Sequence, residues 1–321
     1  MGRLIKDKYE EWKAECNERF YALKANEEEL NRIFIDIYGL QDELTPDVAD
    51  RDVTVHRIYD TKDDGPESMK GSGYVRTMRD EIVSLISYAV GCMFGRYSPW
   101  ADGLQFAGGD WAAWYAENRE RLNRDGFSVD EDNIIPVCDD EYFDDDIVAR
   151  FVSFVRAVYG EDTLEENLRF ISDALGGGGA PRDVIRAYFL NGFYADHLKT
   201  YQKRPIYWMF DSGKKNGFKA LIYLHRYRRD LVAKLRTDYI HEQQERYRTQ
   251  LTDIGSAIES ASPSERAKLS RRAEKLRVQS QELEQYEEKV HPYADRMQEI
   301  ELDDGVKVNY AKFAEILAKI G

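Results

Sequence analysis

The sequence KRPIYWMFDSGKKNGFKALIYLHRY, from Lys203 to Tyr227, contains two apolar runs on either side of a lysine-bearing turn. The runs Ile206–Phe210 and Phe218–Leu224 are rich in the aromatic and branched residues that strands favour. Apolar residues on both faces of each run indicate that neither face meets solvent. We therefore predict a β-hairpin buried inside a larger body, with Lys214 and Lys215 at its tip in water.

Helical periodicity covers most of the chain before this hairpin. The segment Ile5–Tyr38 repeats apolar residues at three- and four-residue steps, which predicts one long amphipathic helix that ends at Gly39. A short strand is expected at Val53–Ile58 and an exposed loop at Asp60–Gly73. Further helices are predicted at Thr77–Tyr97, Asp144–Tyr159, Thr163–Leu175, Arg182–Phe193 and Tyr194–Tyr201. In the third of these, Thr163 and Glu166 have the spacing of a capping box.

After the hairpin, apolar residues in Arg229–Ala261 recur near heptad spacing, and the pattern resumes after Ser262 and continues to Val290. Ser262, Pro263 and Glu265 suit the N-cap, N1 and N3 positions of a new helix. We predict an antiparallel helical hairpin that projects from the body.

The remaining C-terminal residues predict a second, smaller hairpin. Ile300–Leu302 and Val306–Val308 flank an Asp-Asp-Gly turn and are expected to pair as strands. A helix is predicted from Tyr310 to Ile320.

These patterns predict an α+β fold that is mainly α-helical. Four segments follow from the pattern breaks: residues 1–175, a mainly helical domain with irregular loops; 176–228, a joint, helices and the β-hairpin; 229–291, the helical hairpin; and 292–321, a β-turn and helix. The tetraglycine run Gly176–Gly179 is interpreted as a flexible joint, because it lies between helical segments.

Composition favours a packed, cytoplasmic protein. The chain has 321 residues, of which 42% are hydrophobic and 12% aromatic, which suffices for substantial cores. No apolar run approaches the roughly 20 residues that span a bilayer, and the N-terminus lacks the apolar core of a signal peptide. The three cysteines and five histidines are scattered, so no metal or catalytic cluster is predicted from them.

The formal net charge of −14 argues against nonspecific nucleic-acid binding, but the charge is uneven. Lys199–Arg248 contains thirteen Lys or Arg and only five Asp or Glu. A basic face of this kind can contact phosphates while the whole chain stays acidic. The candidate DNA-binding residues are Lys203, Arg204, Lys214, Lys215, Lys219, Arg226, Arg228 and Arg229. An ordinary solvated basic face is the alternative interpretation.

Two other clusters have competing interpretations. The acids Asp139, Asp140, Glu141 and Asp144–Asp146 could hold Mg²⁺ for a nuclease, but acids before an apolar helix also stabilise its N-terminus, which is the favoured interpretation. The tryptophans at 100, 111 and 114 are expected to anchor a loop rather than to stack on bases.

Several long strings resemble one known family. They are LKANEEELNRIFIDIYGLQDELTPDV from Leu23, ISYAVGCMFGRYS from Ile86, DNIIPVCDDEYFDDDIVARFVSFV from Asp132, RTDYIHEQQ from Arg236 and LDDGVKVNYAKF from Leu302, together with the hairpin. In this order, and over nearly the whole chain, they resemble the C-terminal region of PglX, the adenine-N6 DNA methyltransferases of BREX phage-defence systems.

The resemblance implies that this chain takes part in DNA methylation but does not itself catalyse the methyl transfer. Such an enzyme binds S-adenosylmethionine through a glycine-rich motif and the target adenine through an Asn-Pro-Pro-Tyr type motif, and no proline of this chain is followed by another. The cofactor is therefore expected in a methyltransferase domain or subunit that this sequence does not contain. The implied function is positioning of double-stranded DNA. The alternative is an interaction module that docks to other phage-defence proteins, and a metal-dependent nuclease is a weaker third.

Overall fold

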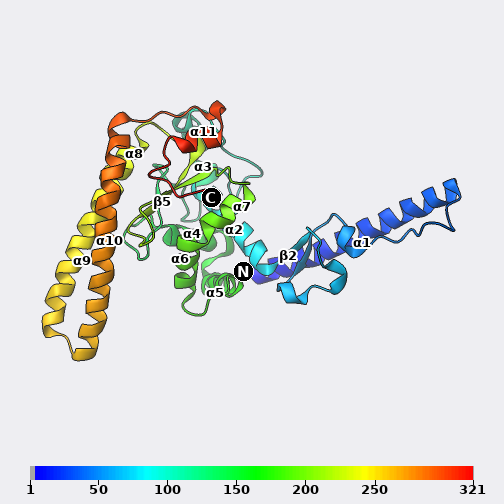
Figure 1. Cartoon of the computed structure of the whole chain (residues 1–321), viewed down its shortest axis with the longest axis horizontal. Helices are drawn as coiled ribbons and strands as arrows, with labels where there is room; N and C mark the ends of the chain where they lie inside the picture. Colours follow the sequence, from blue (N-terminus) through cyan, green and yellow to red (C-terminus); the bar gives the residue numbers. More distant parts are fainter. Residues whose placement is uncertain (1–3, 321) are drawn as a thin grey trace. The chain divides into compact units, whose positions relative to one another are not determined.

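The computed structural model describes residues 4–320, which form two compact units (Figure 1). The first contains the chain up to Ile86 together with Tyr159–Pro181, and the second contains Ser87–Val158 and the chain from Arg182 onward. The predicted fold class, α+β and mainly α-helical, is confirmed. The units differ from the predicted segments, because residues 87–158 of the predicted first segment belong to the second unit.

The first unit is built on one long helix. Its elements are α1 (Ile5–Tyr38), β1 (Arg57–Tyr59), β2 (Val75–Thr77) and α5 (Leu164–Ala174), and α2 (Met78–Met93) begins in it. Helix α1 has the predicted bounds and ends where Gly39 adopts a left-handed conformation with φ 67°. The backbone N–H of Ile5 donates to Asn167 Oδ1 at 2.7 Å, which joins the start of α1 to α5.

Two local predictions for the first unit are wrong. The strand expected at Val53–Ile58 is instead the shorter β1, which pairs in parallel with β2, a segment that the sequence did not identify as a strand. Thr163 does not form the predicted capping box. Its hydroxyl donates to the carbonyl of Tyr159 at 3.0 Å, because the chain makes a 3₁₀ turn just before α5.

A buried antiparallel sheet is the centre of the second unit. Its strands β3 (Ile135–Pro136), β4 (Tyr207–Asp211) and β5 (Lys219–Tyr223) lie in the order β3-β5-β4. The predicted hairpin is confirmed, with Tyr207 opposite Tyr223 and Asp211 opposite Lys219. Every residue of β5 is buried. Strand β3 was not predicted, and its proline lies at the edge of the sheet, where a missing N–H is tolerated.

The C-terminal segment covers the other edge of this sheet. Ala318 N–H donates to the carbonyl of Met209 at 2.8 Å, and Asp211 N–H donates to that of Ile316 at 3.3 Å. The predicted hairpin at 300–308 and the helix from Tyr310 to Ile320 are both wrong: a 3₁₀ turn at Leu302–Asp304 and α11 (Val306–Ala311) stand there instead. Unpaired β4 backbone groups need partners, and an extended segment supplies them where a helix would not.

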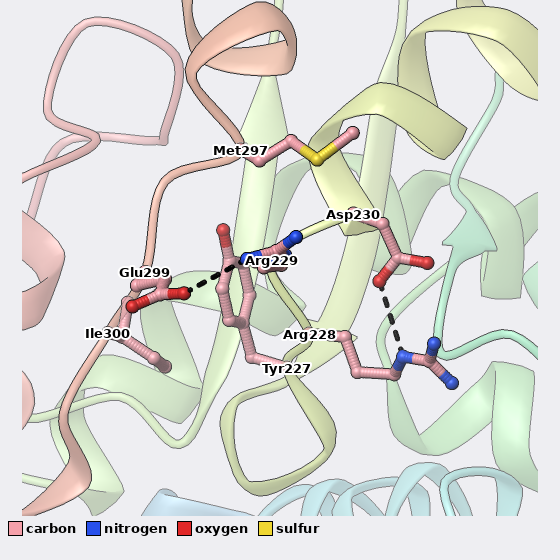
Figure 2. Close-up of a pocket in the computed structure, with 7 residues that line it drawn as sticks. All are labelled: Tyr227, Arg228, Arg229, Asp230, Met297, Glu299 and Ile300. Carbon is pink, nitrogen blue, oxygen red and sulfur yellow. Dashed lines mark hydrogen bonds and ion pairs between the residues drawn. The ribbon is translucent and has the colours of Figure 1, made fainter.

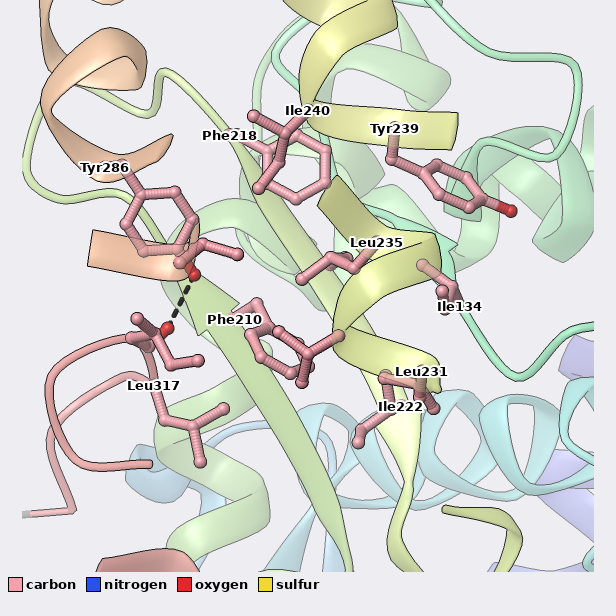
Figure 3. Packing of buried hydrophobic residues seen from close by; sticks show 14 of the residues in the cluster. Ile134, Phe210, Phe218, Ile222, Leu231, Leu235, Tyr239, Ile240, Tyr286 and Leu317 are labelled. Carbon is pink, nitrogen blue, oxygen red and sulfur yellow. Dashed lines mark hydrogen bonds between the residues drawn. The ribbon is translucent and has the colours of Figure 1, made fainter. Parts of the chain in front are cut away.

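Helices surround the sheet. They are α3 (Trp111–Leu122), α4 (Ile147–Tyr159), α6 (Pro181–Asn191), α7 (Phe193–Thr200), α8 (Leu231–Lys234), α9 (His241–Ser260) and α10 (Pro263–Arg296), with a π-helical segment at 235–240 between α8 and α9. Figure 3 shows side chains of β4, β5, the α8 region and α10 packed in one cluster, which includes Phe210, Ile222 and Tyr286. Burial of each such side chain contributes roughly 1.5–3 kcal/mol.

The predicted helical hairpin is confirmed, and α9 and α10 lie side by side (Figure 1). Ser262 and Glu265 form the predicted capping box at the start of α10. Buried residues of α10 begin at Ala273, so the first two turns of α10 lie outside the core. Helix α10 continues past residue 291, the predicted end of the helical hairpin, and contains Pro292. Within residues 4–320, no helix is both long and apolar enough to cross a bilayer.

His197 in α7 makes stability depend on pH. It is 3% exposed, its ring stacks 4.9 Å from that of Tyr207, and its Nε2 accepts the Tyr207 N–H at 3.2 Å. Burial, assisted by the charge of Arg96, lowers the pKa of His197 from 6.5 to about 3. Below pH 6.5 the unfolded chain therefore binds a proton that the folded chain does not.

We expect the free energy of unfolding to fall as the pH drops from 6.5 towards 3, by up to about 1.4 kcal/mol per pH unit from this residue. Urea unfolding of the wild type and His197→Gln across this range measures the effect, since glutamine keeps an acceptor but does not titrate. The same substitution at exposed His56 is the control. Equal slopes for the wild type and His197→Gln would contradict the assignment.

Candidate nucleic-acid interface

The structure leaves six of the eight predicted DNA-binding residues exposed and buries two. Lys219 lies in β5, is 8% exposed, and donates from Nζ to the carbonyl of Leu190 at 3.0 Å. Arg226 is 4% exposed and donates from Nη2 to the carbonyl of Asp130 at 2.8 Å. Lys219 and Arg226 are therefore corrected to structural residues, because neither reaches the surface where phosphates would lie.

Arg226 instead contacts an aromatic cluster at the start of α3. Its guanidinium lies 3.8 Å from the ring centroid of Trp111, which packs against Phe106 at 5.0 Å and Trp114 at 5.6 Å. Burial lowers the pKa of Arg226 to about 10, although Asp130 opposes the change, so the side chain stays charged at neutral pH. These contacts support a packing role for Trp111 and Trp114, although both residues lie in helix α3 and not in the predicted loop.

The six exposed cations fall into two groups. Lys203 and Arg204 precede β4 and Arg228 and Arg229 follow β5, so these four lie at the open end of the hairpin. Lys214 and Lys215 lie in the turn at the other end. Five-residue strands separate the two ends by about 16 Å, so the sequence-predicted set is not one cluster.

At the open end, Arg228 and Arg229 border a pocket of about 650 Å³ (Figure 2). Arg228 Nε lies 3.2 Å from a carboxylate oxygen of Asp230, and Arg229 Nη1 lies 3.5 Å from one of Glu299. The two cations of the pocket are thus matched by two acids. Both pairs are exposed and each contributes about 0–1 kcal/mol, but together they cancel the local positive field.

At the tip, α10 fixes the backbone of the turn. The carboxylate of Glu282 accepts hydrogen bonds from the Ser212 hydroxyl at 2.9 Å, from Lys215 N–H at 2.9 Å and from Gly217 N–H at 3.0 Å. A Cβ at Gly217 would lie 2.7 Å from the backbone oxygen of Gln279, so this close approach requires glycine. The tip backbone is therefore anchored, while Lys214 and Lys215 extend into solvent.

Helix α9 holds the tip from a second side. The hydroxyl of Tyr247 donates to the carbonyl of Gly217 at 2.9 Å, and the side-chain amide of Gln279 in α10 donates to the carbonyls of Lys215 at 3.2 Å and Asn216 at 3.1 Å. Both helices of the helical hairpin thus contact the turn at residues 212–218, which favours a single conformation for the turn.

Helix α10 contributes cations that the sequence analysis missed. Between 266 and 277 the helix contains six Lys or Arg and one acid, a bias as clear as that of the window around the β-hairpin. A pocket of about 360 Å³ is lined by Lys215, Arg271 and Lys275 together with Glu274, Val278 and Gln279. Lys268 precedes Arg271 by three residues and shares its helix face.

We call these residues the tip surface: Lys214, Lys215, Lys268, Arg271 and Lys275. Lys275 forms an ion pair with Asp139. The other four form no ion pair within the part of the chain that the structure describes, residues 4–320. The tip surface therefore has more cations than paired acids, whereas Arg228 and Arg229 at the open end are each paired with an acid.

The acid cluster has partners inside the protein. Asp146 is fully buried, lies 2.8 Å from Arg186, and accepts the Val148 N–H at 2.9 Å at the start of α4. Asp140 is 2.7 Å from Arg272, and Asp145 accepts the hydroxyl of Tyr239 at 2.9 Å. Within residues 4–320, no group of three His, Cys, Asp or Glu is placed to hold a metal ion. The contacts favour the helix-start interpretation over the nuclease.

The tetraglycine run does not fit a cofactor loop. Gly176–Gly179 follows helix α5 and precedes helix α6, whereas a nucleotide-binding glycine loop follows a strand and opens a helix. The tetraglycine run therefore does not have the position in the fold of a nucleotide-binding glycine loop.

Comparison with known proteins gives a match over nearly the whole chain. No protein-family model matches. The chain is 43% identical over 309 residues to the adenine-specific methyltransferase PglX of Lacticaseibacillus casei (strain Zhang), a match that covers 95% of this chain and 24% of that protein. It is 36% identical over 315 residues to the adenine-specific methyltransferase BrxX of Escherichia coli O9:H4 (strain HS), covering 95% and 26%. The chain thus spans about a quarter of the length of these relatives, and the predicted resemblance is confirmed.

The hydrogen bonds to Glu282 lead to a test of the tip. Glu282→Ala removes the acceptor of two backbone N–H groups and one hydroxyl, so we expect a loss of about 1–3 kcal/mol in the free energy of unfolding and faster hydrogen exchange at residues 213–217. Exposed Glu284→Ala, two residues further along α10, is the control. Unchanged exchange at the turn in Glu282→Ala would show that this carboxylate does not fix the tip.

Proposed function

We propose that this chain, the counterpart of about a quarter of a PglX- or BrxX-type adenine-specific methyltransferase, is the C-terminal, non-catalytic part that positions duplex DNA. One observation carries the DNA-positioning role: the tip surface presents four cations that form no ion pair within residues 4–320, two on the anchored turn and two on the adjacent helix α10. Contacts to phosphates fix the register of a protein on a duplex, and Lys and Arg side chains supply most of them.

The fixed backbone supports this role energetically. Binding by a flexible loop costs the entropy of ordering it, roughly 1–2 kcal/mol for each residue. Glu282, Tyr247 and Gln279 already hold the turn, so only the lysine side chains of the tip need to be ordered on DNA. Long, mobile lysine and arginine side chains then adapt to the phosphate spacing.

The proposal assigns the chemistry to another part of the protein. Adenine inside a duplex has to leave the base stack before its N6 is methylated, so a methyltransferase domain extrudes the base while a second part holds the flanking duplex. S-adenosylmethionine belongs to that domain. In this proposal the whole protein acts in the cytoplasm as part of BREX phage defence, with other BREX proteins as further partners.

A protein-interaction module is the second candidate function. Exposed apolar residues of α1 favour it, because soluble proteins seldom leave several large apolar side chains of one helix face in water. The two functions concern different surfaces in different units and do not exclude each other.

Fluorescence titration of labelled duplex DNA at several salt concentrations tests the DNA-binding role. We expect salt-dependent binding by the wild type. In Lys214→Glu/Lys215→Glu we expect at least tenfold weaker binding and a slope of log affinity against log salt that is smaller by about 1.8, as for two lost phosphate contacts. The matched control is Arg228→Glu/Arg229→Glu, which makes the same change in net charge where acids already balance the cations.

Two outcomes would contradict this proposal. Equal losses in both variants would indicate a general electrostatic effect and not a specific tip surface. No binding by the wild type at low salt would remove DNA positioning from this chain and favour the protein-interaction module.

A further inference from the structure

The C-terminal half of α1 exposes a continuous apolar face. Its members are Leu30, Ile33, Phe34, Ile37 and Tyr38, which are 54%, 44%, 55%, 68% and 70% exposed. Their spacing of three and four residues places them on one side of the helix. Single exposed apolar residues are common on proteins, but a stripe of five large ones on two turns of helix is typical of an interaction site.

The same helix turns are packed on their other side. Ile35 is 8% exposed, and the segment that follows α1 returns alongside it, as the first unit in Figure 1 shows. Asn31 Nδ2 donates to the carbonyl of Pro46 at 3.1 Å, and Val48 N–H donates to Glu28 Oε1 at 3.2 Å. Helix α1 is therefore held in place by its own unit, and the apolar face is the side that this segment leaves open.

Charges around the face argue against a second copy of the chain as its partner. Glu27, Asp36, Asp42 and Glu43 lie on or next to these turns. The nearby cations are engaged within the chain: Lys24 lies 2.6 Å from Asp50, and Arg32 pairs with Glu29. Two copies that met through this face would bring acidic residues together, which opposes association. The complementary partner is an apolar surface bordered by Lys or Arg.

We infer that this face of α1 docks against the part of a PglX-type methyltransferase that this chain does not contain. The matches cover only 24% and 26% of the relatives, so about three quarters of each relative's polypeptide lies outside the region represented here. This inference rests on the proposed membership of a larger methyltransferase, but not on DNA binding. The occupant is a protein surface with an apolar groove and a basic border.

A binding measurement without DNA tests the docking. The probe is the part of the Lacticaseibacillus casei PglX that lies outside the match, produced separately and shown to be folded by its S-adenosylmethionine binding. We expect the wild-type chain to bind it, and Phe34→Gln/Ile37→Gln to bind at least tenfold more weakly. Glutamine is a good helix former and both positions are exposed, so circular dichroism should show unchanged helicity.

The matched control is Glu29→Gln/Arg32→Gln. It also places two glutamines on α1, at positions outside the apolar face, with Arg32 on the far side of the helix, and it leaves the net charge unchanged. We expect its affinity to stay within about twofold of the wild type, since an exposed ion pair contributes little. Equal weakening by both double variants, or no binding by the wild type, would overturn the inference.

Two further measurements test whether the partner is a second copy of the chain and whether the face is covered in the larger protein. Light scattering gives the mass of the chain alone, and a dimer that Phe34→Gln/Ile37→Gln dissociates would overturn the inference in favour of a second copy.

In a chimera where this chain replaces the matched segment of PglX, maleimide should label Ile37→Cys at least tenfold more slowly than in the isolated chain. It should label Arg32→Cys equally fast in both contexts. The three native cysteines are buried, so labelling reports the introduced thiol. Equal rates for Ile37→Cys in both contexts would contradict docking.

Failure of the docking and failure of the proposed function remain distinguishable. The docking experiments contain no DNA, and the DNA titration contains no PglX fragment. Loss of DNA binding in the tip variant says nothing about α1, which lies in the other unit.

Discussion

Burial of β5 on both edges and both faces is the constraint on which the second unit depends. A central strand has no solvent to satisfy its N–H and C=O groups, so β3 and β4 must pair with it, and the outer edge of β4 in turn needs a partner. The residues around Ile316 and Ala318 supply that partner, so the chain from Leu317 onward pairs with β4 and does not continue a helix. The side chains on the strand faces, such as Phe210 and Ile222, then define the cluster against which α8 and α10 pack. The long helical hairpin is stable because its inner end belongs to this cluster.

The same register determines where positive charge remains available. With Asp211 opposite Lys219, the lysine of the strand is buried near a carboxylate oxygen at 3.8 Å and donates to a backbone carbonyl, so it serves the fold. The next residues form the turn. There the carboxylate of Glu282 accepts hydrogen bonds from two backbone N–H groups and a hydroxyl, and not from the neighbouring lysine side chains. The carboxylate of Glu282 keeps its negative charge while it fixes the backbone of the turn. At the open end, the acids beside Arg228 and Arg229 pair with the arginine side chains themselves, and the local charge cancels.

Local sequence patterns predicted the elements that depend on residues close together in the chain. The other elements depend on contacts between residues far apart in the sequence. The periodicity of Ile5–Tyr38, the capping residues at Ser262 and Glu265, and the apolar runs of the β-hairpin each lie within a short window, and all three were predicted correctly. The burial of Lys219 and Arg226 depends on partners about 30 and 96 residues away, which a list of basic residues does not contain. The cations of α10 were visible as a composition bias, but only the contact of Gln279 with the turn shows that they lie beside Lys214 and Lys215.

The two candidate surfaces are opposite in character, and this argues for different partners. The tip surface is polar and positive, consists of exposed side chains, and suits a partner with repeated negative charge. The α1 face is apolar with acidic neighbours, and its helix is held from behind by the segment that contains Pro46 and Val48. Burying such a face stabilises an interface only when the partner surface is complementary in shape, which a folded protein provides and a DNA backbone does not. If the chain is one part of a larger methyltransferase, the apolar face is suited to permanent attachment and the basic tip to reversible, salt-dependent contact with DNA.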